Sequence, residues 1–164
     1  MLFDQMHSDL QQTVRDEDIG LPPVRFGSDG LQIVRTLRVP GQATRMQVVR
    51  YRLDGGHIVR YASTSLVNVG QLRAAATASE MMHWSSVELA DDVARFRIRL
   101  YVPHNGWVDD WQGAQNAIYI KLNTLPLPGS GGEGPAPRDI TGVELEILVS
   151  GQTGPLTRIF LVGQ

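Results

Sequence analysis

Apolar residues at the start of the chain recur in steps of three and four. The stretch "MLFDQMHSDLQQTV" places on one stripe Leu2, Phe3, Met6, Leu10 and Val14. This spacing predicts an amphipathic helix over residues 1–14, and such a stripe usually faces the domain's own core. No N-cap residue precedes the stripe. The charges, Gly20 and the two prolines of "RDEDIGLPP" end the helix.

Beyond residue 23 the pattern changes to short runs in which apolar and polar residues alternate. Such runs predict about seven strands, at residues 31–39, 46–53, 57–63, 94–102, 116–122, 142–149 and 156–162. Asp54, Gly55 and Gly56 separate two of them and predict a hairpin. The stretch "SGQTGP" predicts a second hairpin between the last two strands.

Two segments have no strand pattern. Residues 64–90 are expected to form a loop with a short helix, because "LRAAATASEMM" is rich in helix formers but has poor apolar spacing. Residues 126–137 form a Gly/Pro-rich excursion. Within it, "GSGGEG" (129–134) matches G-x-G-x-x-G. The prolines that follow oppose the helix that a dinucleotide site needs, and a flexible loop is the favoured interpretation.

Together these elements predict an α+β domain. Sequential hairpins imply a mostly antiparallel sheet, and the stripe of the first helix supplies an apolar face to cover it. The chain has 164 residues, of which 42% are hydrophobic, so residues 1–164 suit one domain with a real core.

The amino-acid composition bears on which classes of function the protein could have. The net charge of -2 gives no support for wholesale nucleic-acid binding. The absence of cysteine excludes disulfides, thiolate metal sites and a cysteine nucleophile. The sequence contains no signal peptide and no apolar run of about 18 residues that would indicate a membrane span.

The residues that could carry chemistry do not form a catalytic set. The histidines, which lack metal-ligand spacing, are His7, His57, His83 and His104. Asp91 and Asp92 precede a strand, where a solvated turn explains them. No G-x-S-x-G is present. We therefore expect a binding or structural module without catalytic activity, cofactor or metal.

The most distinctive loop is "HNGWVDDWQG" (104–113), where Asp109 and Asp110 lie between Trp107 and Trp111. Carboxylates bind calcium and tryptophans stack on sugars, so a calcium site or a carbohydrate-binding module is an alternative. Calcium loops place oxygen ligands at alternating positions, which this loop does not. The favoured interpretation is that the tryptophans close the end of the sheet and the aspartates are solvated.

Arginines line the polar faces of several predicted strands. They are Arg50, Arg52, Arg60, Arg95, Arg97 and Arg99, and an acidic row on another strand consists of Glu144 and Glu146. Cross-strand Arg–Glu ladders or protein–protein contact explain these rows better than a nucleic-acid groove, which needs excess positive charge and interleaved aromatics.

The ordered segments resemble the J-type minor pseudopilins of the type II secretion system (the GspJ/PulJ family). They are "FDQMHSDLQQTV…RDED", "VVRYRLDGGHIVRY", "ELADDVARFRIRLYV…NGWVDDW", "ITGVELEILV" and "LTRIFLV". The resemblance covers nearly all of the chain, except residues 64–90 and the excursion at 126–137. It implies a pseudopilin fold, in which a truncated N-terminal helix packs on a mostly antiparallel sheet. The helix would be the remnant, over residues 1–15, of a longer helix that anchors the complete protein in the inner membrane.

The resemblance implies a structural role in the periplasm. J-type pseudopilins join I- and K-type pseudopilins at the pseudopilus tip, where the complex starts the filament and supports protein export. An H-type pseudopilin and secreted cargo are further expected partners. A second helix face could meet a neighbouring subunit, through Gln5, Ser8, Asp9 and Gln12. A minor pilin of a type IV pilus is a close alternative.

Overall fold

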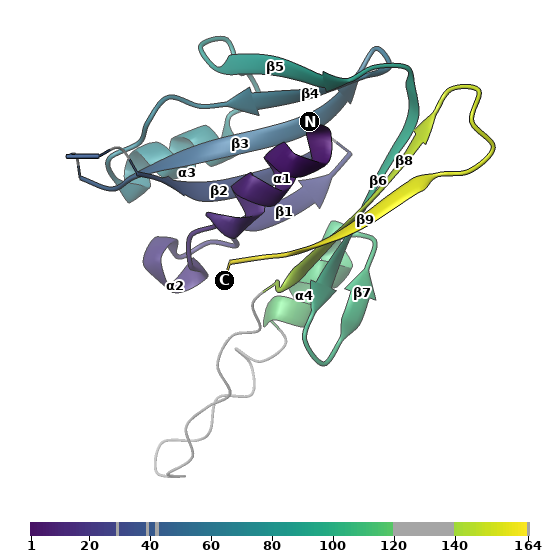
Figure 1. The fold of residues 1–164 in the computed structure, drawn as a ribbon. Coiled ribbons are helices and arrows are strands. Elements are labelled where there is room, and N and C mark those ends of the chain that lie inside the picture. Colours follow the sequence, from purple (N-terminus) through teal and green to yellow (C-terminus); the bar gives the residue numbers. More distant parts are fainter. Residues whose placement is uncertain (29, 39, 42, 120–139, 164) are drawn as a thin grey trace.

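The computed structural model describes residues 1–28, 30–38, 40–41, 43–119 and 140–163, and Figure 1 shows their arrangement. The helices are α1 (Leu2–Gln11), α2 (Asp16–Ile19), α3 (Val69–Thr77) and α4 (Trp111–Tyr119). The strands are β1 (Val24–Gly27), β2 (Gly30–Leu37), β3 (Arg45–Asp54), β4 (His57–Ala62), β5 (Ser85–Ala90), β6 (Val93–Val102), β7 (Gly106–Val108), β8 (Gly142–Val149) and β9 (Leu156–Leu161).

The strands form two antiparallel sheets rather than one. The first sheet has the order β1-β2-β3-β4-β5 and the second has the order β7-β6-β8-β9. Strands account for more of the described residues than the short helices do. The fold is therefore mostly antiparallel β. The predicted α+β pseudopilin fold, with an N-terminal helix packed on one sheet, is wrong.

The division into two sheets arises at the turn between β5 and β6. Asp92 has a φ of 53°, and this left-handed conformation redirects the chain. The Val93 N–H then donates to the Gly56 carbonyl at 2.8 Å, and the Ser150 N–H donates to the Asp92 carbonyl at 2.6 Å. β6 consequently pairs with β7 and β8 instead of extending the first sheet. Asp91 and Asp92 are exposed, which confirms that they occupy a solvated turn.

Both predicted hairpins are confirmed. β3 pairs with β4 through Asp54 and His57, and the intervening Gly55 and Gly56 have φ values of 57° and 88°. Two consecutive positive φ values match the hairpin turn that suits twisted strands. β8 pairs with β9 in the same antiparallel manner.

The strand predicted at residues 116–122 is wrong for residues 116–119, which belong to α4. Asp110 Oδ1 accepts a hydrogen bond from the Gly113 N–H at 2.6 Å, as an N-cap residue does. Ala114, Ala117 and Ile118 are buried at helical spacing. Residues 120–122 and the Gly/Pro-rich excursion at 126–137 lie outside the described residues.

Residues 64–90 contain more structure than the sequence predicted. The short helix is confirmed as α3, and its N-cap Asn68 accepts from the Gln71 N–H at 2.9 Å. β5, however, was predicted as loop. β1 and β7 were likewise missed, because each is too short to show a periodic pattern.

The α1 stripe is buried between the first sheet and β9. Leu2, Met6 and Leu10 belong to the main core cluster, which also contains inward residues of both sheets. Val14 lies beyond the end of α1 and is buried in the smaller cluster under α3. Phe3 is half-buried beside Phe160, with ring centroids 6.3 Å apart. The prediction that this stripe belongs to the core is confirmed.

The polar side of α1 carries a buried carboxylate. Asp9 has no exposed surface and is surrounded by donors from three strands of the first sheet. Asp9 Oδ2 accepts from the Tyr51 hydroxyl at 2.6 Å and from Arg60 Nε at 2.7 Å. Asp9 Oδ1 lies 2.9 Å from an amino nitrogen of Arg35. α1 is therefore held to the first sheet by charge as well as by apolar contact.

The surroundings of Asp9 change the pKa values of its partners. Burial raises the pKa of the Tyr51 phenol far above its usual 10.0, and the adjacent Asp9 carboxylate adds to the effect. Burial lowers the pKa of Arg35, although Asp9 opposes that shift. For Arg60, burial is the largest single influence and acts to lower the pKa, but the hydrogen bond and the charge of Asp9, together with Tyr51, outweigh burial and the pKa is raised.

We expect Asp9→Asn to reduce the free energy of unfolding by about 3–5 kcal/mol, because it leaves two largely buried guanidinium groups without their counter-charge. Urea unfolding followed by circular dichroism measures the change. Asp4→Asn is the matched control, because the Asp4 side chain is 91% exposed. It should change the unfolding free energy by less than about 0.5 kcal/mol. Equal effects of the two substitutions would contradict the assigned role of Asp9.

We also expect the free energy of unfolding to fall as the pH rises above 10.0, the usual pKa of tyrosine. The folded protein holds Tyr51 in its neutral form, so only the unfolded chain releases this proton. One such proton contributes a slope of about 1.4 kcal/mol per pH unit. Tyr51→Phe should remove that slope, and the control Tyr101→Phe should retain it. Unfolding titrations between pH 8 and 11.5 test this; identical slopes would refute it.

Candidate interaction surface

The outer face of the second sheet carries two rows of paired side chains. The first row joins Tyr101, Gly142 and Leu161, which lie opposite one another on β6, β8 and β9. The second row joins Arg99, Glu144 and Ile159 in the same way. Directly opposed residues of antiparallel strands point to the same face. The outer face therefore combines aromatic, ionic and aliphatic groups within neighbouring rows.

Trp107 covers the glycine of the first row. Its ring lies beside that of Tyr101, with centroids 5.2 Å apart at an interplanar angle of 65°. A Cβ on Gly142 would lie 3.1 Å from the Tyr101 Cβ and 3.6 Å from the Trp107 indole. The missing side chain of Gly142 thus makes room for the two aromatic rings.

Ion pairs fix the neighbouring row. Arg99 donates to both carboxylate oxygens of Glu144, at 2.7 and 2.8 Å. Arg95 pairs with Glu146 at 3.0 Å. The predicted cross-strand Arg–Glu pairing is confirmed for these two arginines, whereas Arg97 pairs with a loop residue, Asp109, at 3.2 Å. Pairs of this partly exposed kind contribute about 0–1 kcal/mol each.

The apolar part of this face is exposed along β9. Ile159 is 59% exposed, Leu161 51% and Tyr101 37%. With Trp107 and Gly142 they line a shallow groove. β9 is the last strand of its sheet, so its outer edge has no strand partner among the described residues. Exposed apolar side chains beside an open strand edge are typical of a surface that another protein covers.

The residues predicted for a second helix face have varied environments. Asp9 is buried, and Gln5 Nε2 donates to Asp9 Oδ1 at 3.3 Å. Gln12 is exposed, and its side-chain oxygen accepts from Arg35 at 3.1 Å. Ser8 is half-buried. Asp9 thus has an internal role, and contact with a partner through this helix face stays a prediction.

The structure separates the two tryptophans of the distinctive loop. Trp107 lies on the outer face of the second sheet, whereas Trp111 packs edge-on against Phe26 of the first sheet, with centroids 6.5 Å apart. Asp109 is engaged by Arg97 and Asp110 caps α4. The two tryptophans therefore form no shared sugar platform.

Among the described residues, no group of three or more His, Asp or Glu side chains could hold a metal ion. In the described ranges, no helix has the length and apolar character needed to cross a membrane.

The sequence pattern alone does not single out Ile159 or Leu161 as surface residues. The stretch "LTRIFLV" has apolar residues on both faces, and Phe160 is the buried one. A strand that is apolar on both faces usually lies inside a sheet. One feature of the sequence indicates their exposure. β9 is the last strand of a hairpin, and a strand at the edge of a sheet can leave one of its apolar faces uncovered.

These features define a two-sheet antiparallel β domain with an exposed apolar edge. No family model matches the chain, and no curated protein matches its sequence.

We expect Gly142→Val to displace Trp107, because the added methyl groups enter the space that the indole occupies. Tryptophan emission and near-ultraviolet circular dichroism should change while far-ultraviolet circular dichroism is retained. Gly27→Val is the matched control, since a Cβ at this strand glycine meets nothing within 4 Å. If both variants leave the tryptophan signals unchanged, Trp107 does not cover Gly142.

Proposed function

We propose that this protein is a structural subunit of a secretion filament, specifically a J-type minor pseudopilin of the type II secretion system. It would assemble with I- and K-type pseudopilins at the tip of the pseudopilus and help to start the filament. The ordered sequence segments that resemble this family support the proposal. The observation that carries it is the exposed apolar surface formed by Tyr101, Ile159 and Leu161.

The physical basis is the cost of leaving this surface in water. Aliphatic side chains gain about 25 cal/mol for each Å² that a partner removes from solvent. Ile159 and Leu161 are more than half exposed and neighbour the aromatic pair of Tyr101 and Trp107. Aromatic and aliphatic groups of this kind form the centre of protein interfaces, surrounded by a polar rim. The Arg99–Glu144 pair is placed to contribute to such a rim.

A subunit of this kind also needs a rigid frame. The buried Asp9 joins α1 to β2, β3 and β4, while α1 contacts β9 on its other side. β9 is therefore supported from beneath by a helix that is itself fixed. Rigid interface elements lose little conformational entropy when they bind.

The proposal has consequences for location and partners. The domain would work in the periplasm, in a protein anchored in the inner membrane. An H-type pseudopilin and secreted cargo would be further partners. No catalytic step, cofactor or nucleic acid enters this role.

We expect Ile159→Asp to abolish assembly with the soluble domains of the I- and K-type partners, because it introduces a charge into the apolar contact. Sedimentation velocity of the mixed domains at tens of micromolar measures assembly. Val87→Asp is the matched control, since Val87 is 49% exposed on β5 of the other sheet. It should assemble like the unmodified protein. The proposal fails if the unmodified domains do not associate, and the assigned surface fails if both variants still assemble.

The same mixing experiment addresses the close alternative. A minor pilin of a type IV pilus would associate with minor pilins of that system rather than with I- and K-type pseudopilins. Glycan binding that is lost on Trp107→Ala would instead support a carbohydrate-binding module.

A further inference from the structure

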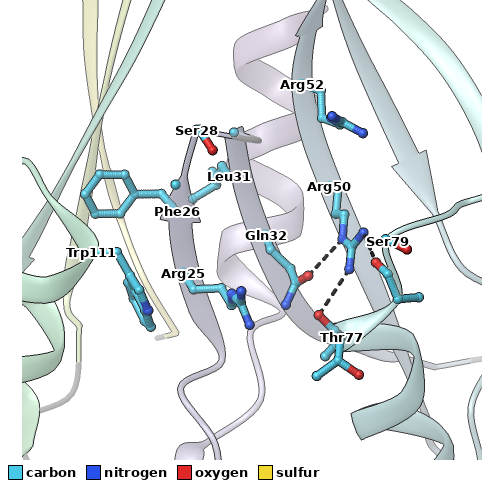
Figure 2. A pocket seen from close by; sticks show the side chains of 14 residues that line it. Arg25, Phe26, Ser28, Leu31, Gln32, Arg50, Arg52, Thr77, Ser79 and Trp111 are labelled. Carbon is cyan, nitrogen blue, oxygen red and sulfur yellow. Dashed lines mark hydrogen bonds between the residues drawn. The ribbon is translucent and has the colours of Figure 1, made fainter.

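A second surface lies on the face of the first sheet opposite to the face that contacts the buried Asp9 carboxylate. Between β1, β2, β3 and the end of α3 is a hollow of about 470 Å³. Figure 2 shows the side chains that line it. Three of them are arginines, Arg25, Arg50 and Arg52, and none of the described lining residues is acidic.

The floor of the hollow is a row of three opposed residues. Arg25 on β1 lies opposite Gln32 on β2, which lies opposite Arg50 on β3. Their side chains therefore share one face of the first sheet and neighbour one another. The hollow continues toward Arg52, which lies beside Gly30. A Cβ on Gly30 would lie 2.0 Å from the Tyr51 carbonyl oxygen, so this position excludes a side chain.

Arg50 has a structural role within this row. Its guanidinium donates to the Ala78 carbonyl at 2.7 Å and to the Ala76 carbonyl at 3.1 Å, at the C-terminal end of α3. Its Nε donates to Gln32 Oε1 at 2.8 Å. Arg50 thereby fixes the orientation of the Gln32 amide, because a donor requires the amide oxygen on its side.

The fixed orientation leaves a donor of Gln32 unused. Gln32 is 6% exposed, and its Nε2 is buried without a hydrogen-bond partner among the described residues. Figure 2 shows this nitrogen turned toward Arg25 and away from Arg50. A buried amide donor without an acceptor costs about 1–3 kcal/mol. Native proteins therefore rarely leave such a donor without an acceptor from the protein, a water molecule or a ligand.

Arg25 supplies a second donor beside the Gln32 amide. Its guanidinium lies over the Trp111 ring, 5.9 Å from the centroid, which holds it at the rim of the hollow. Neither Arg25 nor Arg52 forms an ion pair with a carboxylate of the described residues. Two neighbouring donors, one of them charged, define a position that suits a negatively charged acceptor.

We propose that this hollow binds a carboxylate group, with the Arg25 guanidinium and Gln32 Nε2 as its donors and Arg52 adding positive charge. A planar carboxylate presents two acceptor oxygens, one for each donor. Phe26 and Trp111 add apolar lining, and the volume exceeds that of a carboxylate alone. The ligand is thus an acid with a short apolar stem, such as a glutamate side chain or a small dicarboxylic acid. This site is independent of the filament role.

Side-chain NMR of the isotopically labelled chain tests the site, with glutarate as the probe. Glutarate should shift the Gln32 side-chain amide and Arg25 Nε resonances and saturate in the millimolar range, whereas neutral glutaramide should not. Arg25→Gln should weaken binding by roughly tenfold or more, as expected for the loss of a charge-assisted donor. Arg95→Gln is the charge-matched control and should bind as the unmodified chain does. No saturable shift, or equal weakening by both variants, overturns the proposal.

Two further probes, a glutamate-containing peptide and inorganic phosphate, identify the source of the carboxylate. Tighter binding of a glutamate-containing peptide than of glutarate would support the site and assign it to a protein segment. Equal or weaker binding of the peptide would support it as a site for a small acid. Stronger binding of inorganic phosphate than of either would overturn the carboxylate assignment.

The chain itself contains a competing carboxylate. Asp29 neighbours Gly30 in the sequence and lies outside the described residues. Two results together would show that the acceptor belongs to the chain itself. Glutarate would bind the Asp29→Asn variant but not the unmodified chain, and this substitution alone, without ligand, would shift the resonance of the Gln32 side-chain amide. Those results would also overturn the proposal.

Discussion

The buried carboxylate of Asp9 is the interaction on which the arrangement of the domain depends. A charge without solvent is tolerated only when donors surround it, and here the donors come from β2, β3 and β4. The apolar stripe of α1 alone would allow the helix to shift or rotate on the apolar surface of the sheet. The paired charges permit one position, because any shift removes Asp9 from Tyr51 or from one of the two arginines. Removing one partner of such a buried ion pair is strongly destabilising, because it leaves an uncompensated buried charge.

The fixed helix determines how the two sheets are joined. Leu2, Met6 and Leu10 fill the core together with inward residues of both sheets, and α1 lies between the first sheet and β9 (Figure 1). β9 thus has a solid support under Phe160, while Ile159 and Leu161 remain on the outside. The exposed apolar groups are held on a rigid strand rather than on a loop. An interface of this kind requires little reorganisation on binding.

How far the sequence predicts this structure depends on the range of the interactions involved. The Asp54-Gly55-Gly56 turn and the alternation of β6 are local signals, and the structure follows them. The division into two sheets depends on the conformation of Asp92 and on where β6 finds a partner, which no local pattern specifies. Residues 116–119 carry β-compatible side chains, but the Asp110 cap and helical burial prevail. Asp9 and Gln32 are ordinary polar residues in the sequence. Asp9 gains its role from Arg35, which lies more than 20 positions away in the sequence. Gln32 gains its role from Arg50, which is 18 positions away.

The two faces of the first sheet differ in whether their buried polar groups have hydrogen-bond partners. Successive residues of a strand point to opposite sides, so Tyr51 faces α1 while Arg50 faces α3. On the α1 face the Asp9 oxygens are saturated with donors, and the site is closed. On the other face the donors outnumber the described acceptors, because Gln32 Nε2 has none and Arg25 rests only on an aromatic ring. The same β-strand pairing therefore positions the Asp9 site, whose polar groups are all paired, on one face. On the other face it positions a site in which the Gln32 amide donor has no acceptor. The Gln32 amide cannot rotate to redirect its Nε2 without breaking the hydrogen bond between its Oε1 and Arg50 Nε. That rigidity keeps the open face ready for an acidic ligand.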